Sequence, residues 1–110
     1  MVKQGDIIKI GFNPQSGHEQ AGNRPAVVIS NNFFNEKAKL AIVCPITNTD
    51  KNFPLHVRLD DRTETTGVVL CEHVRSLDVN SRVHTFIETM PKDLLETIIN
   101  KVFAEIELQQ

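Results

Sequence analysis

The sequence GHEQAGNRPAVVIS, residues 17–30, changes character in the middle of one short segment. Its first part is polar and contains glycines at residues 17 and 22, which is typical of a loop. Its second part begins at the Arg24-Pro25 step and continues as a run of apolar, largely β-branched residues, which is typical of a buried strand. We therefore predict a strand over residues 24–30 that follows directly on a polar loop, and loops held in this way commonly carry function.

Alternation and short apolar runs predict further strands on both sides of this segment. Residues 6–12 and 55–59 alternate in the pattern of a strand with one buried face. Short apolar runs that fit buried strands occupy residues 40–46 and 67–71, and residues 83–87 are predicted to form the final strand. Together these segments predict five or six short antiparallel strands.

The segments between these strands are predicted to be loops and connections. Residues 13–23 contain proline and glycine among polar residues, and residues 31–39 are a largely polar connection. Within the strand predicted over residues 55–59, alternation points His56 and Arg58 outward.

The C-terminal part of the chain has a different period. From Pro91 onward the apolar side chains follow one helical stripe, namely Leu94, Leu95, Ile98, Ile99, Val102, Phe103 and Ile106. Proline is well tolerated in the first turn of a helix, because its missing N–H has no partner there. The sequence thus predicts a mainly β protein of the α+β type, a small antiparallel barrel with an amphipathic C-terminal helix, as one domain over residues 1–110.

Composition and charge narrow the class of protein. The 110 residues carry a net charge of −2, which argues against general binding of duplex DNA but permits a local basic groove for one short strand. No apolar run is long enough for a membrane span, and the N-terminus lacks the apolar region of a secretory signal. Cys44 and Cys71 lie in apolar runs and are expected to be buried thiols, which fits a cytoplasmic protein.

Arg24 and Thr47 are candidates for binding a phosphate. Pro25 biases Arg24 toward an extended conformation, so its guanidinium would project from a strand end and could hold a phosphate through two parallel hydrogen bonds. The alternative is an ion pair with a nearby carboxylate. Thr47 closes an apolar strand, where its hydroxyl can donate to a phosphate or cap the following turn.

Several ionisable side chains are further candidates. His18 has the residue type that suits proton transfer near neutral pH, and Glu19 follows it. Glu72 and Arg75 follow a buried strand, where they form either the edge of a site or a network of ion pairs. The histidines lack the spacing of metal ligands, so we expect neither a metal site nor a cofactor.

The order and spacing of these segments resemble the MazF/Kid/PemK family of toxin–antitoxin ribonucleases. The most specific match is the Gly-His-Glu-Gln-x-Gly-x-Arg-Pro segment, and the similarity covers nearly the whole chain. The other matching pieces are Gly5-Asp6-Ile7-Ile8, Pro45-Ile46-Thr47, Lys51-Asn52-Phe53-Pro54, Thr66-Gly67-Val68-Val69, Cys71 to Asp78 and the helix beginning at Pro91.

The resemblance implies a fold, an activity and partners. Members of the family have an SH3-like barrel with a C-terminal helix, work as homodimers and are neutralised by a cognate antitoxin. They cleave single-stranded RNA, chiefly mRNA at short sequences, without metal, by attack of a ribose 2′-OH that leaves a 2′,3′-cyclic phosphate and a 5′-OH. The alternatives from other classes are a non-catalytic SH3-like binding module and a gyrase-poisoning toxin with a similar barrel.

The resemblance also assigns roles to residues of this chain. Arg24 and Thr47 match the family residues that bind and stabilise the phosphate, and His18 and Glu19 match loop residues implicated in catalysis. Residues expected to contact RNA are Lys51, Gln20, Asn23, Glu72 and Arg75. Leu70 stands where some members carry an arginine before the acidic base, which leaves the acid and base roles open and favours Arg24 as the proton donor.

Overall fold

The computed structural model describes residues 1–12 and 22–110 of the chain. These residues form strands and helices in the order β1 (Asp6–Gly11), β2 (Asn23–Val28), α1 (Asn32–Ala38), β3 (Ala41–Thr47), β4 (His56–Arg58), β5 (Val68–Leu70), β6 (Arg75–Leu77), β7 (His84–Thr89) and α2 (Lys92–Ile106). Two single-turn 3-10 helices, η1 (Cys71–His73) and η2 (Val79–Ser81), flank β6. The predicted mainly β, antiparallel fold with a C-terminal helix is confirmed.

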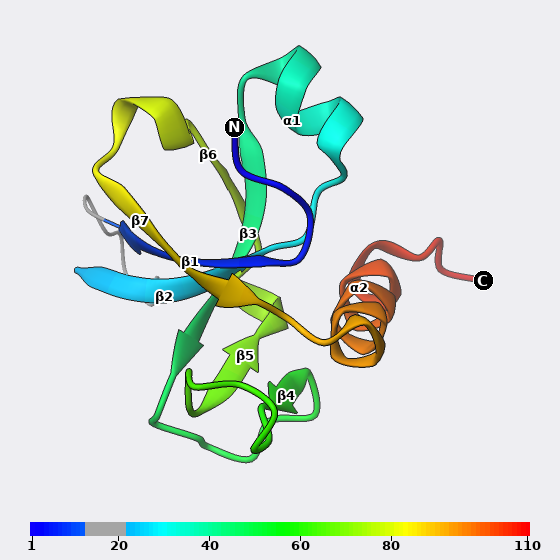
Figure 1. The fold of residues 1–110 in the computed structure, drawn as a ribbon. Helices are drawn as coiled ribbons and strands as arrows, with labels where there is room; N and C mark the ends of the chain where they lie inside the picture. Colours follow the sequence, from blue (N-terminus) through cyan, green and yellow to red (C-terminus); the bar gives the residue numbers. More distant parts are fainter. Residues whose placement is uncertain (13–21) are drawn as a thin grey trace.

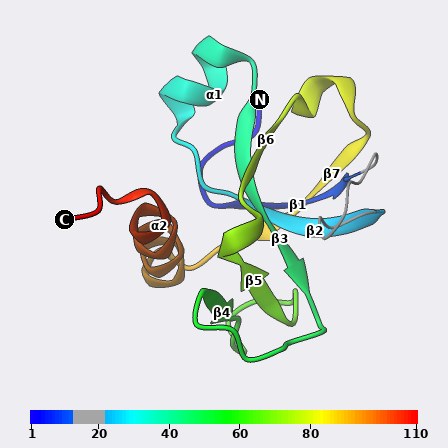
Figure 2. The same cartoon turned by 180° about the vertical axis from the view of Figure 1, so that it is seen from behind.

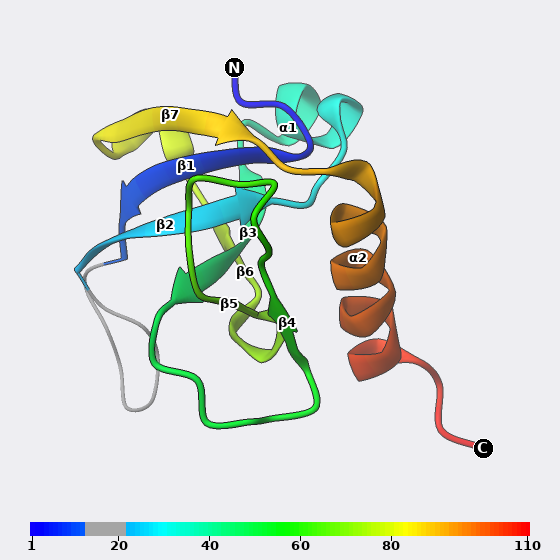
Figure 3. The ribbon, with the colours of Figure 1, turned by 60° about the horizontal axis from the view of Figure 1, so that its bottom comes forward.

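Strand β3 is the centre of the sheet (Figure 1). It pairs with β2 along one edge and, along its other edge, with β6 at its start and with β5 at its end. The strand order β4-β5-β3-β2-β1-β7 therefore makes one strongly curved, open barrel-like sheet, whose far strands β4 and β7 lie on opposite sides of β3 (Figure 3).

Both faces of this sheet are buried. Successive side chains of a strand point to opposite faces, so one strand can supply side chains to both faces. The helix face, which α2 covers, includes Ile7, Val27, Cys44, Ile46 and Val69. The opposite face includes Ile8, Ile10, Ala26, Val28 and Val43. Strands β1, β2 and β3 contribute to both clusters, which explains the nearly continuous apolar sequence of β3.

Helix α2 lies against one side of the sheet, beside the start of β1 and near η1 (Figures 1 and 2). Ile98 is fully buried, and Leu94 and Leu95 pack against the same cluster. The predicted stripe is buried only in part, since Phe103 and Ile106 are 65% and 75% exposed. Pro91 stands at the N-cap position, immediately before the helix.

Helix α1 corrects the prediction of a polar connection over residues 31–39. Asn31 caps this helix, since its side chain accepts a hydrogen bond from the backbone N–H of Phe34 at 2.9 Å. Lys39 ends it with a φ of 60°. The polarity of the segment is explained by Asn35, which is fully buried and contacts the hydroxyl of Ser30 and the carbonyl of Ser30.

Two further expectations are wrong. Strand β6 occupies residues that were interpreted only as a cluster of ionisable side chains, because the pairing of so short a strand with β3 has no local signal. His56 does not point outward into solvent, since its side chain is only 8% exposed. Most of the loop predicted over residues 13–23, namely residues 13–21, lies outside the described residues.

The two cysteines are buried, as predicted. Their thiols form a hydrogen bond, and this contact, followed by burial, raises the pKa of Cys44 far above its ordinary value. A thiol held in its protonated form is a poor nucleophile, so Cys44 has a packing role in the helix face.

Gly67, just before β5, lies very close to the backbone carbonyl of Thr47, and this approach supplies a test of the fold. Its φ is +113°, and a Cβ placed there would lie 2.2 Å from the carbonyl oxygen of Thr47. Gly67→Ala is therefore expected to lower the free energy of unfolding by about 3 kcal/mol, measured by urea unfolding. Gly22→Ala is the matched control: its φ is +77°, but its Cβ would meet no described atom within 4 Å, so only about 1 kcal/mol is expected. Equal losses in both variants would contradict the close-approach argument.

Candidate functional site

The register of β2 and β3 puts Arg24 and Thr47 on the same face of the sheet. Ala26 pairs with Pro45 and Val27 with Cys44. Arg24 lies two residues before Ala26, and Thr47 lies two residues after Pro45, each within its own strand. Side chains two residues apart on a strand point to the same face. Arg24 and Thr47 therefore both lie on the opposite face, Arg24 near the start of β2 and Thr47 at the end of β3.

Thr47 has one of the two roles that its sequence position allowed. Its Oγ1 accepts a hydrogen bond from the backbone N–H of Thr49 at 3.2 Å, so it does cap the following turn. A hydroxyl also carries one donor, and that donor remains for a ligand. Thr47 is only 8% exposed, so the packing around this residue restricts the position of its hydroxyl.

Arg75 also points to the opposite face. It pairs with Val43 in the β3–β6 ladder, and paired residues share a face. Its guanidinium lies over the ring of Phe12, 5.9 Å from the ring centroid, and Phe12 follows β1 where β1 pairs with the start of β2. Among the described residues its Nη1 is buried without a hydrogen-bond partner. The positive charge of Arg75 therefore lies toward the end of the sheet that carries Arg24.

The remaining predicted residues fall into two groups. Asn23 is exposed at the start of β2, next to Arg24, and Lys51 is exposed in the segment between β3 and β4. The other three, His18, Glu19 and Gln20, lie outside the described residues. Their roles stay predictions.

Glu72 is brought to His56 rather than to Arg24. The imidazole of His56 lies between two carboxylates, with Nδ1 3.1 Å from Asp50 Oδ1 and Nε2 2.8 Å from Glu72 Oε2. Asp50 also pairs with the guanidinium of Arg58. These four residues, Asp50, His56, Arg58 and Glu72, form a charge network that joins the β3–β4 segment to β4 and η1.

The charge network perturbs the pKa of two of its members. Burial acts to lower the pKa of His56, but hydrogen bonds to Asp50 and Glu72 outweigh it and raise the pKa above its ordinary value. The hydrogen bond from His56, followed by that from the backbone of Asn52, lowers the pKa of Asp50. The imidazolium form can donate from both nitrogens, which is why two carboxylates favour it. The sequence suggested such a network only through Glu72, because nothing local connects residues 50, 56 and 72.

Across residues 1–12 and 22–110, no group of three or more histidine, cysteine, aspartate or glutamate side chains is placed to hold a metal ion. Within the same residues, no helix has both the length and the apolar character needed to cross a membrane.

An open, barrel-like antiparallel sheet with a C-terminal helix packed against it defines a small, mainly β protein. The chain matches the family described as PemK-like, MazF-like toxin of type II toxin-antitoxin system over residues 3–105. That match spans nearly the whole sequence, and the chain belongs to this family.

Individual relatives agree with this assignment. The chain is 33% identical over 109 residues to the Endoribonuclease PemK of Escherichia coli, covering 96% of this chain and 79% of the relative. It is 37% identical over 98 residues to the Endoribonuclease toxin MazF of Escherichia coli strain K12, covering 89% and 87%. A crystal structure of MazF from Deinococcus radiodurans superposes with a TM-score of 0.91 at 36% identity over 97% of both chains. A MazE-MazF structure from that organism gives 0.84 at 35% identity, covering 98% of this chain and 97% of the other.

The charge network generates a prediction about pH. Because the pKa of His56 is raised above about 6.5, the charged imidazole stabilises the fold fully below about pH 6.5 and loses this effect as the pH rises through the folded-state pKa. The lowered pKa of Asp50 acts in the other direction: its contribution is present above about pH 4 and is lost as the pH falls through the folded-state pKa. His56→Gln should cost about 1 to 3 kcal/mol near pH 6 and less at high pH, measured by urea unfolding from about pH 5 to about pH 9.

The exposed His84 on β7 provides the control for this experiment. His84→Gln should leave both the stability and its pH dependence close to those of the wild type. A stability loss in His56→Gln that is the same at every pH would contradict a charged role for the imidazole.

Proposed function

We propose that this chain is a metal-independent endoribonuclease toxin that cleaves single-stranded RNA and is inhibited by a cognate antitoxin. Family membership supports the class, and the relatives named endoribonucleases support the reaction. The structural observation that carries the proposal is the register of β2 and β3, which puts Arg24 and Thr47 on one face.

The reaction requires a base, a proton donor and stabilisation of negative charge. A base removes the proton of a ribose 2′-OH, and the oxygen attacks the adjacent phosphorus to form a 2′,3′-cyclic phosphate. The bond from phosphorus to the 5′ oxygen breaks, and this oxygen takes a proton to become a 5′-OH. Negative charge accumulates on the non-bridging oxygens during the step, so donors aimed at them lower the barrier.

Arg24 and Thr47 are suited to the phosphate part of this chemistry. A guanidinium offers two parallel donors to the phosphate oxygens, and the Thr47 hydroxyl, oriented by the N–H of Thr49, offers a third. Arg75 adds positive charge on the same face. Proton transfer is assigned to Arg24 as donor, with His18 and Glu19 as the candidates for the base.

A non-catalytic binding module and a gyrase-poisoning toxin are the competing functions. Either would have the barrel, but neither accounts for relatives at 33% and 37% identity that are named endoribonucleases. Incubation of the pure protein with RNA in the presence of a chelator separates them, because only the enzyme yields cyclic-phosphate ends.

Substitutions of Arg24 and Thr47 test the phosphate site. Arg24→Ala is expected to lower the cleavage rate at least about 100-fold, since donors to the developing charge are worth this much or more. Thr47→Val removes the hydroxyl and should lower the rate about 10-fold or more, whereas Thr47→Ser keeps it and should stay close to wild type. The measurement is single-turnover cleavage of a short RNA.

The folding of each variant is checked by its thermal unfolding midpoint. A variant that folds normally and has lost cleavage supports the assignment. Wild-type cleavage by a folded Arg24→Ala protein would remove Arg24 from the site.

The expected partners follow from the same proposal. We expect a cytoplasmic homodimer whose RNA groove is blocked by the antitoxin, and the MazE-MazF structure from Deinococcus radiodurans supports a protein partner of this kind. Sedimentation of the pure protein should give twice the mass of one chain, and the antitoxin expressed with it should abolish RNA cleavage at equimolar amounts. A monomer with full activity would contradict the dimer.

A further inference from the structure

Thr47 is part of a row of side chains. Thr47 pairs with Val68 in the β3–β5 ladder, and Val68 pairs with Arg58 in the β4–β5 ladder. Since directly opposed residues share a face, the row Thr47, Val68, Arg58 crosses three strands on the opposite face, which is also the face of Arg24. The far end of the row thus carries a second guanidinium.

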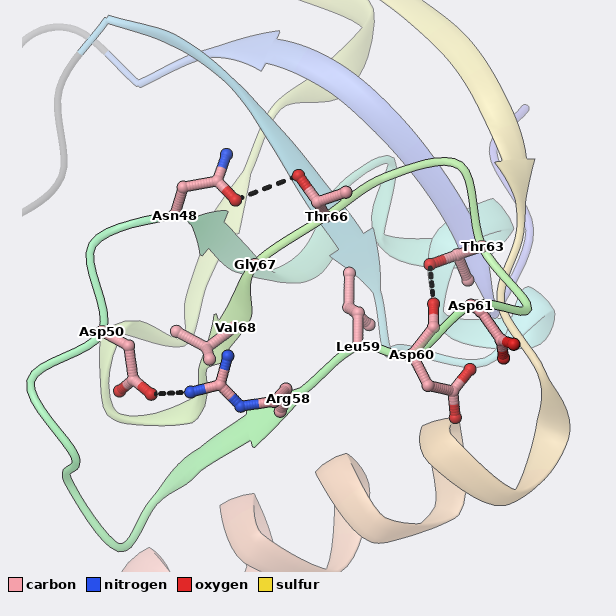
Figure 4. A pocket seen from close by; sticks show the side chains of 10 residues that line it. All are labelled: Asn48, Asp50, Arg58, Leu59, Asp60, Asp61, Thr63, Thr66, Gly67 and Val68. Atoms are coloured by element: carbon pink, nitrogen blue, oxygen red, sulfur yellow. Dashed lines mark hydrogen bonds and ion pairs between the residues drawn. The ribbon is translucent and has the colours of Figure 1, made fainter.

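A pocket opens at this end of the row (Figure 4). Its volume is about 460 Å³, which lies in the range of small-ligand sites. Its lining comes from three segments, which are the residues after β3, the end of β4 with the loop that follows, and the start of β5. Figure 4 shows Val68 and Leu59 between the polar side chains of Asn48, Arg58 and Thr66.

The walls of the pocket are held in place before any ligand arrives. Gly67 lies against the carbonyl of Thr47, and Thr66 Oγ1 donates to Asn48 Oδ1 at 3.0 Å. The loop between β4 and β5 is anchored by Glu88, which accepts hydrogen bonds from the backbone N–H of Thr65 at 2.8 Å and from that of Glu64 at 3.1 Å. A pocket of fixed shape beside the phosphate site can discriminate between ligands.

Its charge favours a neutral occupant over a phosphate. Three carboxylates line the pocket, those of Asp50, Asp60 and Asp61, against the one guanidinium of Arg58. Arg62 neutralises Asp60 from outside, through bonds to both of its carboxylate oxygens. A phosphate would be repelled here, whereas a flat base with donors and acceptors on its edges would not.

The donors that face the pocket come from Arg58 and Asn48. Asn48 uses its oxygen to accept from Thr66, which leaves its amide N–H groups to donate. Among the described residues, Arg58 is bonded through Nη2 to Asp50, and the rest of the guanidinium fork remains for a ligand. Guanine presents acceptors at O6 and N7 to such donors and an amino group on its other edge to carboxylates.

We propose that this pocket is a nucleobase subsite for a nucleotide next to the cleaved phosphate, and that Arg58 makes it specific for guanine. The inference rests on the proposed RNA cleavage. Arg58 is a specificity residue, which Asp50 and the rest of the charge network hold across the pocket. A base seated between Arg58 and Val68 would lie on the same face as the phosphate held by Arg24 and Thr47.

The test uses short RNAs that differ only in the base on either side of the cut. The wild type should favour guanine at one of these positions by about 10-fold in kcat/KM, the usual effect of one good arginine–guanine contact. Arg58→Met should lose this preference. Arg58→Lys keeps the charge but not the planar fork and should also lose the preference.

Arg62→Met is the matched control, because Arg62 is also an ion-paired arginine of this region but does not line the pocket. It should keep the guanine preference. Binding of the same RNAs with a 2′-deoxy nucleotide at the cut separates the two proposals, since it reports base preference without cleavage. A guanine preference in binding that Arg58→Met abolishes supports the subsite even if no RNA is cut. A preference that survives in folded Arg58→Met, or that Arg62→Met loses equally, overturns it.

Discussion

The backbone pairing of β3 with three other strands is the constraint on which the rest of this molecule depends. The register with β2 puts Arg24 on the same face as Thr47, and the registers with β5 and β4 align Thr47 with Val68 and Arg58. A shift of one residue in either ladder would turn these side chains to the other face. The register of β3 with β5 depends on Gly67, which lies just before β5 and so close to Thr47 that a Cβ would not fit.

The helix face of the sheet serves packing, and the opposite face carries the side chains proposed for chemistry. The helix face is closed by α2 around Ile98 and the buried thiol of Cys44, and it presents no reactive group among the described residues. The opposite face ends in arginines and a hydroxyl that extend past its apolar core. A charge network around His56 then holds the outermost strand and its arginine in place. Rigid packing on one face supports exact placement of polar groups on the other.

Elements with a long or strong local pattern were predictable. The helix from Lys92 and the strand around Val27 have periodic or continuous apolar sequences, and burial requires them to form. Helix α1 was missed because its signal is an N-cap and one buried asparagine rather than an apolar stripe. Strand β6 was missed because three residues carry no periodicity, and only pairing with β3 makes them a strand.

The sequence by itself determined the class of fold, the family resemblance, and Arg24 and Thr47 as the candidate phosphate residues, because these depend on local pattern and on motif spacing. The tertiary structure alone decided that Arg24 and Thr47 lie on the same face and that Glu72 turns to His56. It also placed Arg58 beside a pocket at the end of the row that starts at Thr47. The physical reason is that strand register and buried charge pairing join residues far apart in the chain, and no local stretch of sequence carries that information.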